Sequence, residues 1–79
     1  MIEVTSARYL DEYKIWIEFN DGTAGVADLH NDLWGQIFEP LKDRELFKNF
    51  KISEIMNTIE WENGADLAPE FLYKKVKIV

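Results

Sequence analysis

The chain of 79 residues contains no cysteine. Disulfide bonds and thiolate chemistry are therefore excluded, and a small extracellular scaffold held by disulfides is disfavoured. Apolar runs are only a few residues long, whereas a membrane-spanning helix needs about 20 apolar residues. The start of the chain lacks the basic segment and apolar run that mark a signal peptide. We therefore expect a cytoplasmic protein with no membrane partner.

Basic residues are in the minority, because Lys and Arg number 9 against 15 Asp and Glu, and the net charge is −6. Phosphate backbones repel an acidic chain, so nucleic acid is not expected as a direct partner. The charge is uneven, since residues 11–39 carry seven acids and one base. Such a segment is either a solvated face or a surface for a basic partner.

Glycine is also scarce, and the four glycines are dispersed at predicted turns, so no phosphate-binding loop is present. Because the chain has a single histidine, few side chains are available as the base that activates a nucleophile. Glu60, Glu62 and Asp66 could form an acid–base group near Trp61, but solvated carboxylates at a turn explain them more simply. We predict no catalytic residues, no cofactor and no enzyme activity.

The hydrophobic content suffices for the core of one domain over residues 1–79, because 47 % of residues are hydrophobic and 14 % aromatic. Alternating apolar residues predict strands, and one amphipathic stretch predicts a helix with Asp43 as its N-cap. The expected fold is α+β, a small antiparallel sheet of four to five strands with one or two short helices. The strands are predicted over 2–10, 13–19, 23–28, 51–55 and 57–61, and the helix over 44–50.

Some residues between these elements predict particular turns and element boundaries. Asp21-Gly22 predicts a hairpin turn, and Pro69 fits the first turn of a final short helix. Pro40 predicts an extended connection over residues 38–41. Residues 29–35 form a short amphipathic stretch that could be a helical turn or an irregular link. The tail 74–79 could be helix or strand.

Large amphipathic side chains are the strongest sign of recognition. Trp16, Trp34 and Trp61 are of the type enriched at interface centres, and Trp16 is predicted on the polar side of its strand. A core role explains Trp16 equally well, and both readings stay open. Asp28, His30 and Asp32 are weak candidates for a metal site, since alternation could align them, but no metal is expected.

Several segments together resemble a known family. The most specific is Trp61-x-Asn63-Gly64-Ala65-Asp66-Leu67-Ala68-Pro69, supported by residues 17–22, 26–29 and 38–43. In order and spacing, about residues 2–73 resemble the small bacterial family called domain of unknown function 2442. A turn at Asn63-Gly64 and a helix cap at Asp66 account for the motif without a ligand. A surface site of Trp61, Asn63 and Asp66 for a peptide or small polar ligand is the functional alternative.

The resemblance implies a compact α+β domain and no catalytic residues. Members of the family occur alone or beside a DNA-binding helix-turn-helix region, and some resemble partners encoded next to toxin-like genes. No room for such a region follows Tyr73 here, so direct DNA binding is not carried over. The leading hypothesis is a protein-interaction module, either self-associating or bound to a basic protein, with an antitoxin-like role as its most concrete form. The alternative is a small-molecule or metal-binding domain without catalysis.

Overall fold

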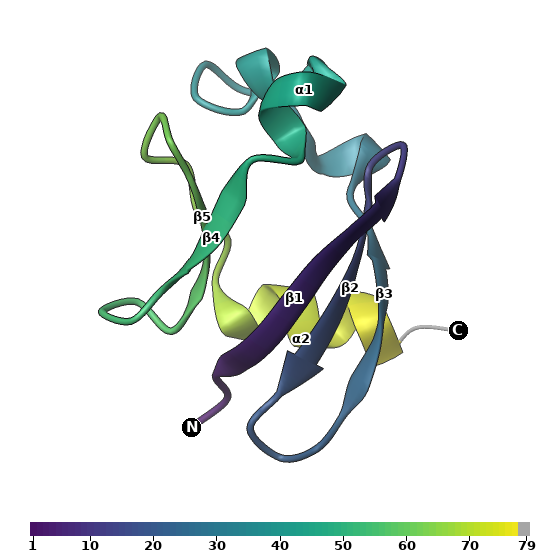
Figure 1. Cartoon of the computed structure of the whole chain (residues 1–79), viewed down its shortest axis with the longest axis vertical. Coiled ribbons are helices and arrows are strands. Elements are labelled where there is room, and N and C mark those ends of the chain that lie inside the picture. Colours follow the sequence, from purple (N-terminus) through teal and green to yellow (C-terminus); the bar gives the residue numbers. More distant parts are fainter. Residues whose placement is uncertain (78–79) are drawn as a thin grey trace.

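Three antiparallel strands form the larger sheet of the computed structural model, which describes residues 1–77. They are β1 (Val4–Asp11), β2 (Lys14–Phe19) and β3 (Ala24–Asp28), in the order β1-β2-β3 (Figure 1). Alternation along β2 buries Ile15, Ile17 and Phe19 on one face. The β2–β3 turn has a positive φ of 87° at Gly22, which confirms the hairpin predicted there.

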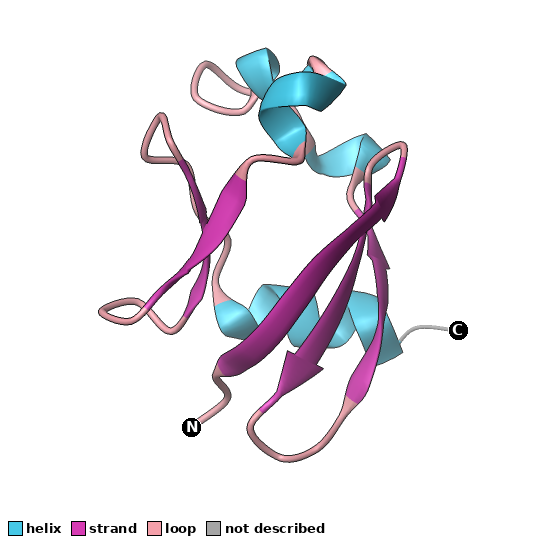
Figure 2. Cartoon of the chain, in the orientation of Figure 1, coloured by secondary structure: helices cyan, strands magenta, loops and turns pink. Residues whose placement is uncertain are grey.

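A second, two-stranded sheet stands beside the first and consists of β4 (Phe50–Ser53) and β5 (Thr58–Trp61) (Figure 2). The backbone N–H of Val4 donates to the carbonyl of Asn57 at 2.9 Å, which joins β1 to the β4–β5 turn. The five strands confirm the predicted α+β class, although they are divided between two sheets. The residues that join them are far apart in the sequence, so strand patterns alone did not reveal this division.

Short helical segments connect the two sheets. The 3₁₀ helices are η1 (His30–Asp32) and η2 (Glu39–Lys42), and the α-helix α1 (Arg44–Phe47) follows η2. Asp43 caps α1 as predicted, because its side chain accepts a hydrogen bond from the backbone N–H of Glu45 at 2.9 Å. Glu45 also forms an ion pair with Lys48 at 3.1 Å.

Two predictions in this region are wrong. Pro40 does not lie in an extended connection but in the first turn of η2, where the missing N–H of proline costs no helical hydrogen bond. The predicted helix over 44–50 ends at Phe47, because Phe50 pairs with Trp61 in the second sheet instead of extending the helix. Long-range strand pairing thus overrides a short helical pattern.

The last helix, α2 (Pro69–Lys77), begins at Pro69 as predicted. It packs on the larger sheet and contacts β3, where a Cβ added to Gly25 would lie 3.3 Å from the Cβ of Val76. Of the tail 74–79, residues 74–77 are helical, and residues 78 and 79 lie outside the described part of the chain. In residues 1–77, no helix is long and apolar enough to cross a membrane.

The core lies between the two sheets and the helical connections. Its largest buried side chains are Trp61, Phe19 and Phe47. The ring of Phe47 contacts the rings of Tyr13 and Trp61, with centroids 5.3 and 5.7 Å apart. This aromatic cluster ties the larger sheet to the smaller one and positions the surface above Trp61.

Candidate functional site

Trp61 is a core residue, with only 1 % of its surface exposed. Its indole N–H donates to the carbonyl of Phe47 at 2.7 Å, and the rings of Phe38, Phe47 and Phe50 surround it. The structure therefore corrects the expectation that Trp61 offers its side chain at the surface. Trp61 instead supports the surface that lies over it.

Asn63 connects two loops above Trp61. Its side-chain Nδ2 donates to the carbonyl of Ile37 at 2.8 Å, and its Oδ1 accepts from the backbone N–H of Ala65 at 3.1 Å. Gly64 has a φ of 90°, as the predicted turn requires. Both polar ends of Asn63 are thus used inside the protein, so its role here is to hold the 34–38 loop against the β5 turn.

The third residue of the predicted site, Asp66, is half-buried and pairs through its backbone with Glu60 in an isolated bridge. Within the described residues, no hydrogen bond joins its side chain to α2, so its predicted role as the cap of that helix is wrong. Thr58 makes the connection to this segment, because its hydroxyl donates to the carbonyl of Leu67 at 2.6 Å.

A small apolar depression, which we call the Trp61 groove, lies where η2, α1 and the β5 turn meet. Its volume is about 130 Å³. Trp61 and Leu41 are almost fully buried and form its floor, whereas Leu46 is 46 % exposed and stands at its wall. The complete lining is Pro40, Leu41, Leu46, Asn49, Trp61, Glu62 and Asn63.

A wider, more polar depression of about 430 Å³ adjoins the groove and shares Asn49, Trp61 and Glu62 with it. Its charged residues are Glu60, Glu62 and Lys51. Lys51 lies opposite Glu60 in the β4–β5 register, but none of the three is in an ion pair within the described residues. The two depressions together form an apolar slot that opens onto carboxylates.

Large apolar side chains are exposed on the loop that Asn63 holds and on α1. Trp34 is 71 % exposed and Ile37 is 46 % exposed, and both belong to the loop that Asn63 holds in place. Leu46 adds a third such side chain from α1. Exposed apolar side chains that gather in one region are a common property of interaction surfaces.

Trp16 lies on the outer face of the larger sheet, in a row with Arg8 and Val26. It is half-buried, and the guanidinium of Arg8 stands 5.2 Å from the centre of its ring. Arg8 therefore covers part of the ring, as a cation–π contact allows. The predicted solvent side of this strand is confirmed.

The weak metal candidates do not converge. Asp28 accepts a hydrogen bond from the backbone N–H of His30 at 3.0 Å, the His30 ring packs on Tyr13, and Asp32 pairs with the ammonium of Lys75 at 2.9 Å. Over residues 1–77, no three His, Cys, Asp or Glu side chains are grouped so as to hold a metal ion.

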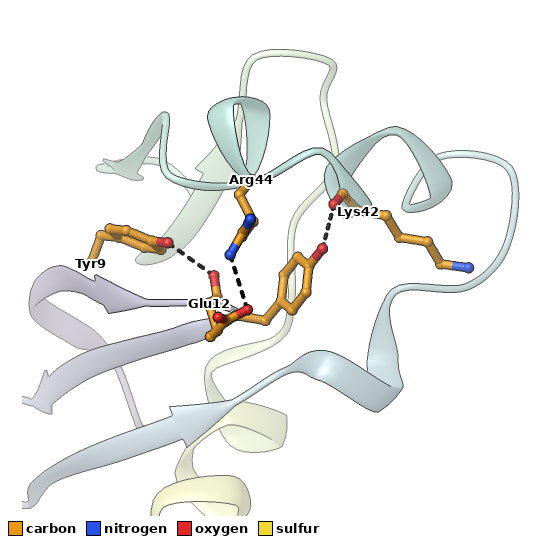
Figure 3. A network of polar contacts seen from close by, with 5 residues as sticks. Tyr9, Glu12, Lys42 and Arg44 are labelled. Carbon is orange, nitrogen blue, oxygen red and sulfur yellow. Dashed lines mark hydrogen bonds and ion pairs between the residues drawn. The ribbon is translucent and has the colours of Figure 1, made fainter.

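The acid-rich segment 11–39 does not form one acidic face. Glu12, Asp32 and Glu39 each pair with a base from the second half of the chain, at 3.2, 2.9 and 3.1 Å. Figure 3 shows how Arg44 of α1 reaches Glu12 in the β1–β2 turn, next to the hydrogen bond from the Tyr9 hydroxyl to the Glu12 carbonyl. Ion pairs thus engage three of the seven acids of this segment, and the other four lie outside the ion pairs of the described residues.

Among the carboxyl groups of the described residues, Asp21 has a clearly altered pKa. The hydroxyl of Tyr73 donates to it at 2.7 Å and lowers the pKa of Asp21 below its ordinary value, and the backbone N–H of Thr23 adds to the effect. Hydrogen bonds to the charged form always act in this direction. This contact ties the β2–β3 turn to α2 and is structural.

Sequence reasoning missed the walls of the groove. Pro40, Leu46 and Asn49 were interpreted as parts of a connection and a helix, because nothing in their spacing predicts a shared depression. The motif that begins at Trp61 was the only sequence signal for this region, and the fold places Trp61 beneath the groove.

Comparison with known proteins agrees with the resemblance seen in the sequence. The family model described as Protein of unknown function (DUF2442) matches residues 4–77. A solved structure from Nitrosomonas europaea, described as a candidate DNA-binding protein, superposes with a TM-score of 0.84 at 20 % identity, over 98 % of this chain. The aligned region is 50 % of that protein, so this chain spans about half of its length. No curated protein matches significantly.

The description of this structural neighbour overturns one expectation. Nucleic acid was excluded as a direct partner because the net charge is −6, yet a protein of the same fold is described as DNA binding. Net charge is a property of the whole chain and does not determine what a local surface, or a further part of a longer protein, binds. The exclusion of nucleic acid is therefore withdrawn.

Proposed function

Since the chain belongs to the family Protein of unknown function (DUF2442), whose description names no activity, we propose its function from the candidate site. The protein is an interaction module without catalytic activity. It binds a partner protein through the exposed apolar side chains Trp34, Ile37 and Leu46. The cysteine-free composition agrees with action in the cytoplasm.

The exposure of Trp34 carries the proposal. A tryptophan that is 71 % exposed leaves a large apolar area in water, and burial of such area is favourable by about 25 cal/mol per Å². Tryptophan is also among the residues that contribute most binding energy at protein interfaces. The neighbouring loop is held by the Asn63 side chain, so less ordering is needed on binding.

The proposed partner is basic. The acidic surplus leaves carboxylates outside the ion pairs described above, and complementary charge speeds association and selects partners. In its most specific form the role is antitoxin-like, with a basic toxin-like protein as the partner. This form is supported by the family resemblance and by the net charge.

Co-purification tests the proposal. The tagged chain is expressed together with the products of neighbouring genes and isolated at low and high salt. A basic protein should co-elute with the wild-type chain and be released by salt. Trp34→Ala should weaken capture about tenfold or more, as expected for a central anchor, whereas the matched control Trp16→Ala should not. Equal capture by both variants would contradict the proposed surface.

A second candidate function, association with DNA, is favoured by the description of the structural neighbour. Fluorescence anisotropy with labelled duplex DNA would test it directly. Binding that weakens steeply between 50 and 200 mM salt is the expected behaviour of a phosphate-contacting protein. No change in anisotropy at low salt would restrict the function to protein binding.

A further inference from the structure

We infer that the Trp61 groove receives one apolar side chain from a peptide segment of the partner, and that arginine or lysine residues beside it contact Glu60 and Glu62. This inference rests on the proposed function and deepens it by naming the site and the chemistry of its ligand. The occupant is thus a basic peptide segment with a single apolar anchor.

The size and lining of the groove set the nature of the anchor. A cavity of ~150 Å³ lined by apolar side chains holds a benzene-sized molecule, and the Trp61 groove measures about 130 Å³. One aliphatic or small aromatic side chain is therefore the appropriate size. Leu46, which is half-exposed at the wall, would lose its contact with water when the anchor enters.

The charges around the groove determine what flanks the anchor. Its polar extension carries Glu60 and Glu62 against Lys51, and Asp66 lies close to Glu60 through their backbone bridge. Two nearby bases are engaged, because Lys42 of η2 pairs with Glu39, and Lys48, which follows α1, pairs with Glu45. The local surplus is negative, and a basic peptide complements it.

The groove is already formed without a ligand. Its floor is fixed by the hydrogen bond from Trp61 to the Phe47 carbonyl, and its edge is fixed by the two hydrogen bonds of Asn63. A preformed site pays a smaller ordering cost on binding, which makes recognition of a short segment feasible.

The test is an NMR titration of the ¹⁵N-labelled chain with a short peptide that has a central leucine flanked by arginines. The side-chain amides of Asn49 and Asn63 both line the groove and report occupancy. They should shift saturably at peptide concentrations up to ~5 mM, which detects a Kd near 1 mM. Replacing the leucine by alanine should weaken binding about tenfold, and replacing the arginines by glutamates should abolish it.

Two variants assign the contacts. Leu46→Asp should remove binding of the leucine peptide, and Glu62→Lys should weaken it about three- to tenfold. Glu18→Lys is the matched control, because it makes the same charge change opposite Ser6 and Ala24 on the outer face of the larger sheet. It should leave the affinity within about twofold. Backbone amide dispersion of each variant verifies that it is folded.

Two results would overturn the inference. In the first, the Asn49 and Asn63 amides do not respond to any arginine-flanked peptide. In the second, glutamate-flanked peptides bind equally well. If partner capture depends on Trp34 but is unchanged in Leu46→Asp and Glu62→Lys, the inference fails, and the proposed function stands with Trp34 and Ile37 as its binding surface. Capture that Trp34→Ala leaves intact would instead contradict the proposed function.

Discussion

Replacement of Trp61 by phenylalanine separates a core role from a surface role for this residue. The indole N–H that donates to the Phe47 carbonyl is lost, and the carbonyl remains in a buried setting without that donor. An unpaired buried polar group costs about 1–3 kcal/mol. The smaller ring also removes packed atoms, which adds about 1–2 kcal/mol. We expect the free energy of unfolding to fall by about 2–5 kcal/mol.

This loss is large for a chain of 79 residues. At 0.05–0.15 kcal/mol per residue, its total stability is roughly 4–12 kcal/mol. With a urea m-value of about 1–2 kcal/mol/M, the unfolding midpoint should fall by roughly 1–5 M. Circular dichroism is the suitable assay, because the substitution itself removes a fluorophore.

Trp34→Phe is the matched control, since Trp34 is 71 % exposed. Its unfolding free energy should stay within about 0.5 kcal/mol of the wild type. Equal midpoint shifts for the two variants would refute the assignment of Trp61 to the core. The comparison is direct because the same chemical change is made at a buried and an exposed site.

Three further substitutions probe how α2 is attached. Tyr73→Phe should raise the pKa of Asp21 toward 3.8, measurable by NMR titration. Because the folded pKa of Asp21 is lowered, its stabilising effect is complete above pH 3.8 and is lost as pH falls through the folded value, so the variant should be less acid-sensitive there. Lys75→Met leaves the partly buried Asp32 without its cation and should cost about 1–3 kcal/mol in urea unfolding, part of which Asp32→Asn should restore. Gly25→Val places side-chain atoms against α2 and should cost about 1–3 kcal/mol, whereas unchanged stability would show that α2 shifts freely.

Local patterns predicted the elements whose stability depends on neighbouring residues. The alternation in β2, the Gly22 turn, the Asp43 cap and the start of α2 at Pro69 were all predicted correctly. Each depends on backbone preferences or on hydrogen bonds between residues close in sequence. The family resemblance was likewise carried by a local motif, and the family match confirms it.

The failures lie where distant residues compete for the same position. Phe50 fits a helix by its spacing, but pairing with Trp61 places it in β4. Trp61 is of the residue type found at interface centres, but three aromatic contacts and the hydrogen bond from its indole N–H to the Phe47 carbonyl make it a core residue. Hydrophobicity and side-chain size are known from the sequence, whereas the partner that buries a side chain is not.

The sequence by itself determined the fold class, the main strands and turns, the family and the acidic balance, because these depend on composition and short-range geometry. Only the tertiary structure decided that Trp61 lies beneath a groove, that Asn63 holds two loops together, and that bases from the second half pair with three of the seven acids of the acid-rich segment. Apart from the Glu39–Lys42 pair, these contacts join residues 14 or more positions apart, and they form only once the two sheets have packed on a common core.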